Sequence, residues 1–452
     1  MNRLFEISKS GMASAQRSLT VTSNNIVNAD TPGYTRQRVD KMPVGLNTGM
    51  SSIGLGVNIS TATRLRNDMN DVLTNQKRQE FGFMSYKNQV YERLQATMTT
   101  DSGGDLDVRI SRFFDMFSEL ANDPQDISVR NSLISEAQQL TSKFMNIDQT
   151  LSDTGELIAD TAQTTITNIN SLLRDIQALN ESVVQSTHRG APDTTSMDIR
   201  VRKLEELAQL VDFTQMNADS GAVEIRICGV RVLDDEHILQ LKAEVSPNDQ
   251  SFNVRVAGGT IVDVKGGELG AQMDMYSNDI PDFRSKLDEL AKRLVTEINS
   301  IHSAGFGLND AIGRDFFVAS GDQAGTITMN PDLISNPENI AASTISGEAG
   351  NGELASQINE LRNAGLINGR KIVDQTIEII STPGSEVYSL ASQIETNEAE
   401  IAMLQTQQER QSGVNIDEEL ANMIQYQNAY QGAARVMQSA QELYDTLLGI
   451  VV

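Results

Sequence analysis

Tryptophan is absent from the sequence, cysteine occurs once and histidine three times. The single cysteine, Cys228, can form neither an internal disulfide nor a cysteine-built zinc site. We expect it to be a small buried residue in a strand, because free cysteines are among the most buried residues. No histidine has the H-E-x-x-H or H-x-x-x-H spacing of metal ligands, and His237, which follows three acidic residues, is interpreted as part of a solvated turn. We therefore predict no metal site.

Positive charge and long apolar runs are also scarce. The 36 basic residues are outnumbered by 61 acidic ones, which gives a net charge of -25 and disfavours nucleic acids and anionic membranes as partners. No apolar run is long enough to span a bilayer. Arg3, Glu6 and Lys9 interrupt the first apolar residues, so no cleaved secretory signal is predicted. By themselves these features favour a cytoplasmic protein.

Sequence motifs of catalysis are missing as well. There is no phosphate-binding G-x-x-x-x-G-K-[ST] loop and no G-x-S-x-G nucleophile elbow. Gly266-Gly267-x-x-Gly270 lacks the strand-then-helix context of a dinucleotide site, so we interpret it as a turn that enters a helix. Asp417, Glu418 and Glu419 occupy consecutive helical positions, which point apart, and they fit a charged helix start better than a catalytic pair. We predict neither an enzyme nor a cofactor.

The clearest pattern that is present is helical periodicity in residues 412–452. Apolar and small residues alternate in steps of four and three, which predicts one long helix of a coiled-coil-like bundle. Asn415 can cap this helix, so we expect it to begin at about Ile416. A second seam from Tyr426 to Ile450 lies beside the first, and together they are too wide for one partner helix to cover. The apolar tail after Leu447 would be an exposed binding surface in a monomer.

The N-terminus carries a matching seam from Met1 to Ile26, again with steps of four and three. Pro32 and Gly33 then supply the two central positions of a type II turn, which should end the helix. We expect the two terminal helices to pair, with both chain ends at one end of a rod. The predicted assembly interface consists of Met1, Phe5, Met12, Leu19, Ile26, Pro32, Gly33, Tyr34, Leu420, Met423, Tyr430, Met437, Tyr444 and Leu448.

Further helices are predicted through the first half of the chain. Residues 65–98 and 106–122 should be helices separated by a break at 101–105, and the second carries a cluster of phenylalanines that should anchor a core. The periodic run from Leu133 to Val183 predicts a single helix of about fifty residues, roughly 75 Å long, with a possible irregularity near Gly155. A loop and a helix over residues 197–210 follow.

Near Phe213 the apolar period changes to two, which predicts a compact antiparallel β domain inserted into the helical rod. Pro281 should open a further helix to about His302, followed by loops with a short strand at residues 326–329. Helical patterning returns over residues 354–380 and resumes from Val387 to Leu404. Pro383-Gly384, between these two stretches, should kink or break the helix.

The predicted fold is mainly α, with long terminal helices that pair into a coiled-coil-like rod and a small antiparallel β-rich domain in the middle. We expect six segments along the chain. They are an N-terminal inner-core helix (1–34), an extended connector (35–64), a long-helix rod (65–212), a β-rich outer domain (213–350), the returning rod (351–411) and a C-terminal inner-core helix (412–452).

The segment from Asn24 to Tyr34 resembles the N-terminal signature shared by flagellar rod, hook and hook-associated proteins. The residues Thr35-Arg36-Gln37 that follow are similar to the hook-associated protein 1 family. The C-terminal segments 413–419 and 426–431 resemble the same family, and so do residues 266–270 and 299–307.

This resemblance implies a structural protein that joins the flagellar hook to the filament. It also implies export by the flagellar type III apparatus without cleavage, with a disordered N-terminal segment as the address. The implied partners are further copies of the chain, the hook protein, the second junction protein (hook-associated protein 3, FlgL) and a FlgN-like export chaperone on the C-terminal helix. Alternatives are another axial flagellar protein of the hook or distal rod type, an adhesin, or an export-linked wall hydrolase.

Overall fold

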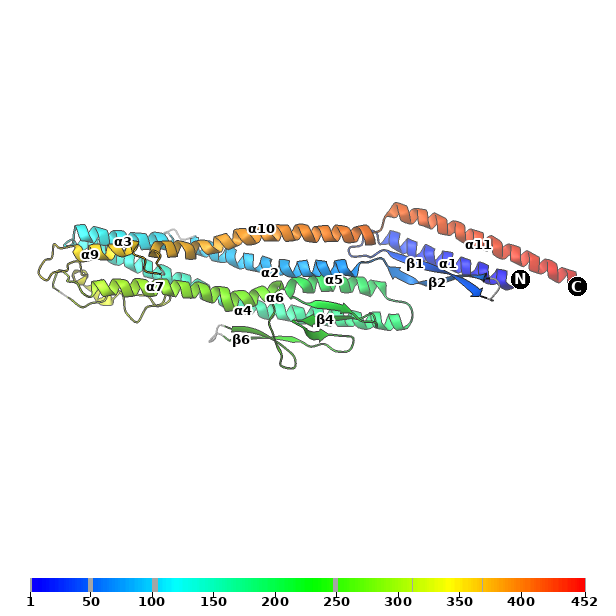
Figure 1. Ribbon diagram of the computed structural model, residues 1–452, viewed down its shortest axis with the longest axis horizontal. Coiled ribbons are helices and arrows are strands. Elements are labelled where there is room, and N and C mark those ends of the chain that lie inside the picture. The colour runs from blue at the N-terminus through cyan, green and yellow to red at the C-terminus, as the bar shows by residue number, and fades with distance from the viewer. Residues whose placement is uncertain are drawn as a thin grey trace.

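The computed structural model describes residues 2–47, 52–99, 105–246, 251–310, 312–367 and 369–451. These residues form a long, narrow helical bundle in which both chain ends lie at the same end (Figure 1). From that end the chain runs to the far end and back twice, so that long helices of opposite direction lie side by side. The predicted fold class, mainly α with small antiparallel sheets in the middle, is confirmed.

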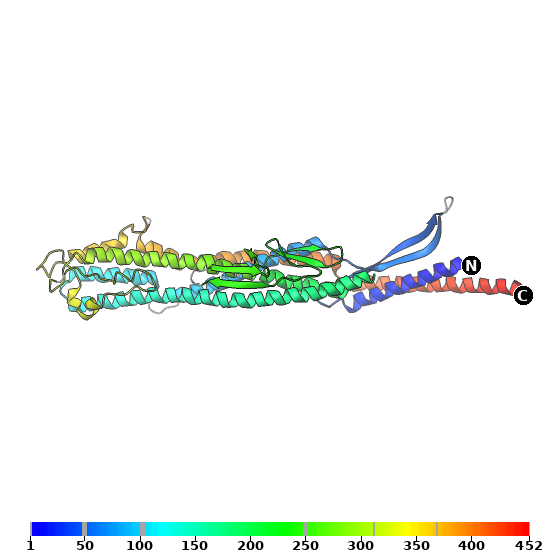
Figure 2. The ribbon, with the colours of Figure 1, turned by 90° about the horizontal axis from the view of Figure 1, so that it is seen from below.

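The end that carries both termini contains two helices and a β-hairpin. The helix α1 (Asn2–Val27) lies beside α11 (Ile416–Val451), and strands β1 (Gln37–Asn47) and β2 (Ser52–Arg64) form an antiparallel hairpin that diverges from the helices in Figure 2. The predicted type II turn follows α1, because Tyr34 N donates to Thr31 O at 3.1 Å and Gly33 has a φ of +77°. The predicted start of α11 is confirmed too, since Asn415 Oδ1 accepts hydrogen bonds from the first-turn amides of Asp417 and Glu418.

Four helices form the first part of the rod. They are α2 (Asp68–Thr99), α3 (Leu106–Asn122), α4 (Ile127–His188) and α5 (Thr194–Leu210). The predicted single long helix is confirmed, because α4 has 62 residues and runs through Gly155 without interruption. At 1.5 Å per residue it is about 93 Å long. The predicted break at 101–105 falls mainly on residues outside the described ranges.

Two three-stranded antiparallel sheets lie along one side of the bundle (Figure 1). The first sheet contains β3 (Thr214–Asn217), β4 (Val223–Ile227) and β5 (Val230–Leu233). The second contains β6 (Leu241–Ser246), β7 (Ser251–Val256) and β8 (Ile261–Val262).

Both sheets are fastened to α4 through asparagine side chains. The Asn170 amide bonds both backbone groups of Leu241 at 2.8 Å, and Asn180 does the same with Val223 at 2.9 and 3.0 Å. Their apolar faces share one buried core with the second half of α4 and with α5. The sheets therefore cover the helical rod directly rather than projecting from it.

Cys228 is not the buried strand residue that we predicted. It is exposed, and with Gly229 it forms the two-residue turn between β4 and β5, where both residues have positive φ values of 50° and 80°. A two-residue hairpin of this geometry fits the right-handed twist of its strands, and turn geometry outweighs the burial preference of cysteine here.

The predicted helix from Pro281 to about His302 is confirmed as α7 (Ile280–His302), with Pro281 in its first turn. The helix α6 (Gly267–Asp274) continues through a π-helical turn at Met275–Asp279 into α7 (Ile280–His302). A wide π turn just before the proline accommodates a residue that lacks a backbone N–H. The glycine segment before α6 does enter a helix as predicted, with Gly266 as its N-cap.

The loops at the far end contain only short helices. These are α8 (Pro331–Ser335) and the 3-10 turns Pro337–Asn339 and Leu361–Asn363. The predicted strand at 326–329 is wrong, since this stretch makes only one isolated bridge, between Phe317 and Met329. Its alternate residues Ile327 and Met329 are apolar because they enter the core from a loop.

The returning part comprises α9 (Glu353–Glu360) and α10 (Ile372–Ser412). The predicted helix over 354–380 is interrupted between them, whereas the predicted break at Pro383 is wrong, because α10 is continuous through it. Contacts along α2 hold α10 in place: Asn70 Nδ2 donates to Leu404 O at 2.9 Å, and Lys77 pairs with Glu400 at 2.8 Å. At the proline itself, Pro383 is buried and a Cβ atom built on Gly384 would lie 3.1 Å from Gln95 Nε2, so α2 also packs against this part of α10.

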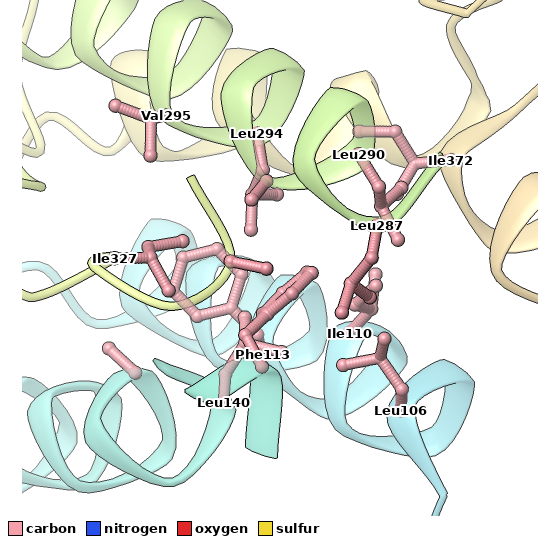
Figure 3. Close-up of a cluster of buried hydrophobic side chains, with 14 of the residues drawn as sticks. Leu106, Ile110, Phe113, Leu140, Leu287, Leu290, Leu294, Val295, Ile327 and Ile372 are labelled. Atoms are coloured by element: carbon pink, nitrogen blue, oxygen red, sulfur yellow. The ribbon is translucent and has the colours of Figure 1, made fainter. Parts of the chain in front are cut away.

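The largest buried core lies toward the far end of the rod. Figure 3 shows side chains from α3, α4, α7, α10 and the loop at Ile327 converging on one another. The predicted aromatic cluster is confirmed, since Phe113, Phe114 and Phe117 are fully buried and Phe113 meets Phe114, Phe117 and Phe316 edge to face. No helix of the described residues is both long enough and apolar enough to cross a membrane.

Candidate assembly interface

The two terminal helices, α1 and α11, contact each other along one face of each helix. Gly11 lies so close to Ala433 that a Cβ atom built on the glycine would be 3.4 Å from the Ala433 Cβ. Further toward the chain ends, Ser8 Oγ lies 3.5 Å from Met437 Sδ. The Phe5 and Tyr444 rings meet edge to face with centroids 6.5 Å apart. The predicted pairing of the two seams is therefore present within a single chain.

This pairing buries little apolar surface. Among the described side chains of α11, only Glu419 and Ala440 are buried. The buried side chains of α1 are mostly small or polar, namely Ser8, Ser14, Ala15, Ser18, Val21, Thr22 and Asn25. Neither apolar core cluster of the described residues includes a member from either helix. Because burial of apolar area is the main source of packing free energy, the pair is weakly held compared with the rod.

Apolar side chains remain exposed on both flanks of α11. Ile416, Leu420 and Ile424 follow one another at steps of four residues and are 45%, 45% and 60% exposed. On the other flank, and nearer the C-terminus, Val436 and Leu443 are 44% and 52% exposed. We call these two groups the apolar flanks of α11. Their position on a helix with a partner on only one side is typical of a protein interface.

The predicted interface residues divide according to this geometry. Leu420 and Tyr444 are exposed, as are Pro32 and Gly33 in the turn. Met1 is outside the described residues, and Leu448 lies in α11 without a described side chain. The partly buried members are Phe5, Met12, Leu19, Ile26, Tyr34, Met423, Tyr430 and Met437. Their contact with neighbouring copies stays a prediction.

Sequence reasoning missed a polar network where the helix pair joins the rod. Asp198, on α5 of the rod, accepts hydrogen bonds from the Thr35 hydroxyl at 2.7 Å and from the Thr35 amide at 3.2 Å. The same carboxylate pairs with Arg64 at 2.7 Å. Thr35 is fully buried, so this contact fixes the chain after the turn against the rod.

Glu419 is the matching anchor on α11. Nε and Nη2 of Arg36 lie 2.8 and 2.7 Å from Glu419 Oε1, while Glu418 pairs with the same guanidinium at 2.9 Å. The buried Asn25 amide joins the network, because its Nδ2 donates to Glu419 and to Gln37 O, and its Oδ1 accepts from Gln37 N and the Tyr34 hydroxyl. These contacts tie α1, the hairpin and α11 together.

The charges in this network reinforce one another. The hydrogen bonding that Arg36 donates to Glu418 is the largest cause that raises the pKa of Arg36, and it also lowers the pKa of Glu418. Burial, with smaller contributions from Asp198 and Glu419, raises the pKa of Tyr34 to about 12, so its hydroxyl is a neutral donor at pH 7. The sequence feature that could have indicated this network is Thr35-Arg36-Gln37 beside a turn. The residues that these three contact, Asp198 and Glu419, lie far away in the sequence, so the contacts themselves could not be predicted.

The site offers surfaces and hydrogen bonds rather than reactive groups. Within the ranges that the structure describes, no three His, Cys, Asp or Glu side chains are grouped to hold a metal ion. The arrangement is suited to joining subunits, because one end of the rod presents paired helices with apolar flanks.

Models of flagellar protein families match three parts of the chain. Residues 91–317, half of the chain, match the family model of the flagellar hook-associated protein FlgK helical domain. Residues 5–35 match a model of the flagella basal body rod protein, and residues 405–450 match the C-terminal model of flagellar basal body rod FlgEFG proteins.

Individual relatives support the same assignment. Flagellar hook-associated protein 1 of Bacillus subtilis is 25% identical over 98% of this chain and 97% of its own length, and that of Escherichia coli is 24% identical over the full length of both. The solved structure of the flagellar hook junction protein FlgK from Burkholderia pseudomallei shares the fold, with a TM-score of 0.63 at 13% identity over 75% of this chain and 99% of that one. The chain therefore belongs to the flagellar hook-associated protein 1 family, whose members are structural components of the flagellum.

Proposed function

We propose that this chain is the axial subunit that joins the flagellar hook to the filament and assembles through its terminal helices. The observation that carries the proposal is the contrast between the two ends of the molecule. The far end packs around a large buried core that includes the phenylalanines, whereas the end with both termini pairs its helices weakly and leaves the apolar flanks of α11 exposed. Exposed apolar stripes on a helix pair are covered when neighbouring subunits pack around it.

In this proposal the inner part, residues 1–34 and 412–452, forms the inner layer of a tube. Equivalent helices of neighbouring copies, of the hook protein and of hook-associated protein 3 surround it. The rod and its sheets lie outside and add lateral contacts. The subunit then acts as a mechanical adapter, because its inner helices pack like those of both neighbours while its outer part follows neither lattice.

Export requires that the same surface be covered beforehand. A FlgN-like chaperone on α11 would shield the apolar flanks, since exposed apolar stripes at cellular concentration favour premature self-association. Passage through the type III apparatus without cleavage brings the subunit to the tip of the growing hook.

Electron microscopy of cells that lack this chain tests the proposal. We expect hooks without filaments, and we expect the full-length chain to restore filaments. A chain that ends at Gln411 should keep a folded rod by circular dichroism, lose chaperone binding and fail to restore filaments. Normal filaments in the deletion strain, or full rescue by the truncated chain, would contradict the proposal.

A further inference from the structure

The segment Thr35–Gln37 lies between the rod and the end of the molecule that contains α1, the hairpin and α11. The backbone of Arg36 donates to Ser412 O, at the end of α10, at 2.9 Å. Its carbonyl accepts from Leu65 N, just before α2, also at 2.9 Å. Residues 65–67 join the hairpin to the rod, and residues 413–415 join the rod to α11. Arg36 therefore bridges both connections.

The side chains of this segment reach in opposite directions. Thr35 is held by Asp198 on the rod, and Arg36 is held by Glu419 on α11. Gln37 bonds the rod as well, because its Nε2 donates to the Thr194 hydroxyl at 2.8 Å, while its backbone bonds Asn25 of α1. Three consecutive residues thus carry bonds to four separate helices, α1, α5, α10 and α11.

We propose that Thr35–Gln37 is a strap that sets the orientation of the terminal helix pair on the rod, with Asp198 and Glu419 as its two anchors. A strap of three residues has little slack, so loosening one anchor frees the other. Asp198 and Glu419 are positioning residues that act on each other through Thr35 and Arg36. The strap does not depend on the proposed function.

Charge and burial favour this role over a surface ion pair. The Asp198 and Glu419 side chains are 10% and 3% exposed, and each accepts several charge-assisted or hydroxyl hydrogen bonds. Buried bonds of this kind fix geometry because a rotated partner would leave a desolvated charge unpaired. Exposed pairs elsewhere on the rod, such as Lys203 with Glu206, carry no such penalty.

Hydrogen exchange of the full-length chain, read by mass spectrometry, tests the strap. In wild type, amides 34–37 should be protected, and Asp198→Asn should speed their exchange about tenfold or more. The decisive readout is residues 419–426 of α11, which Asp198 does not touch and which should also exchange faster in this variant. Residues 287–298 in the far core should not change, which shows that the rod remains folded.

Matched variants separate the strap from a local effect. Asp175→Asn makes the same chemical change on α4 beside α5 and should leave both segments unchanged, because Asp175 is exposed and 3.9 Å from its nearest partner, Lys203. Thr35→Val should resemble Asp198→Asn, and Thr35→Ser should restore protection because it keeps the hydroxyl. Unprotected amides 34–37 in wild type, or an effect of Asp198→Asn confined to residues that touch it, would overturn the strap. Neither result would bear on whether cells lacking the chain form filaments.

Discussion

Arg130 shows how one buried side chain can hold a loop region to a long helix. It is fully buried near the start of α4, where Nε and Nη2 donate to Pro124 O and Nη1 donates to the carbonyls of Ile340 and Pro337. Burial lowers its pKa to about 10, which still leaves the guanidinium charged at pH 7. Its planar fork suits several carbonyls at once, which a lysine ammonium cannot reproduce.

We predict that Arg130→Lys lowers the free energy of unfolding by about 2–4 kcal/mol, because carbonyls and a charge are left unsatisfied in the core. Denaturant unfolding followed by circular dichroism measures this. Arg174→Lys, at an exposed position on the same helix, is the matched control and should change stability by less than about 0.5 kcal/mol. Equal effects of the two variants would refute this role of Arg130.

His302 makes the far end sensitive to acid. The ring is buried, its Nδ1 lies 2.8 Å from Arg314 O, and its Nε2 accepts from Ala341 N at 2.9 Å, so the neutral form is required. Burial lowers its pKa from 6.5 to about 4. The unfolded chain therefore binds the proton first, and stability that is complete above pH 6.5 is lost as the pH falls toward 4. At about 1.4 kcal/mol per pKa unit, the loss is on the order of 3 kcal/mol.

The slope of unfolding free energy against pH between 4 and 6.5 checks this prediction. His302→Gln should have a shallower slope than wild type, whatever its absolute stability. His237→Gln, at an exposed histidine, is the comparison variant. If His302→Gln and wild type have parallel profiles, His302 is not the titrating group.

At the scale of elements, close approach of two helices depends on a glycine. Gly82 of α2 lies against α5 so closely that a Cβ atom would be 2.0 Å from the backbone oxygen of Gln209. We predict that Gly82→Ala destabilises the rod by about 1–3 kcal/mol or more, because the backbone on the other side cannot move aside cheaply. Thermal and denaturant unfolding both report the change.

Gly155 is the matched control, because it is also in a helix interior but has open space around its Cα. Gly155→Ala should stabilise the protein by about 0.5–1 kcal/mol through its better helix propensity. A destabilising Gly155→Ala, or a neutral Gly82→Ala, would be inconsistent with this account of α2–α5 packing.

Elements with strong periodicity could be predicted from sequence, and elements decided by distant contacts could not. The 3.6-residue period placed α4 well, and the start of α11 and the Pro32-Gly33 turn followed from local capping and turn chemistry. Pro383 misled, because α10 is continuous through it where Gly384 lies beside Gln95 of α2. The pairing of Thr35 with Asp198 spans 163 residues of sequence, so no local pattern indicates it.

At the scale of the whole molecule, the two ends of the rod have opposite characters. The far end closes over a core of phenylalanines that loops and helices share, whereas the other end offers two weakly buried helices and a hairpin. A subunit of this kind can be incorporated into a tube through its terminal helices, while its outer part keeps its own shape. The apolar flanks of α11 are the surfaces on which this account depends.

The fraction of hooks that bear filaments, counted by electron microscopy in a deletion strain that expresses Ile424→Glu, tests this account most directly. Ile424 is 60% exposed, so the substitution should leave the purified chain as stable as wild type while placing a charge in a surface that neighbours cover. Gln405→Glu adds the same charge at an exposed position of α10, outside the apolar flanks of α11, and serves as the control. We predict filaments with Gln405→Glu and bare hooks with Ile424→Glu. Full filaments with Ile424→Glu would contradict the assignment of this flank to assembly.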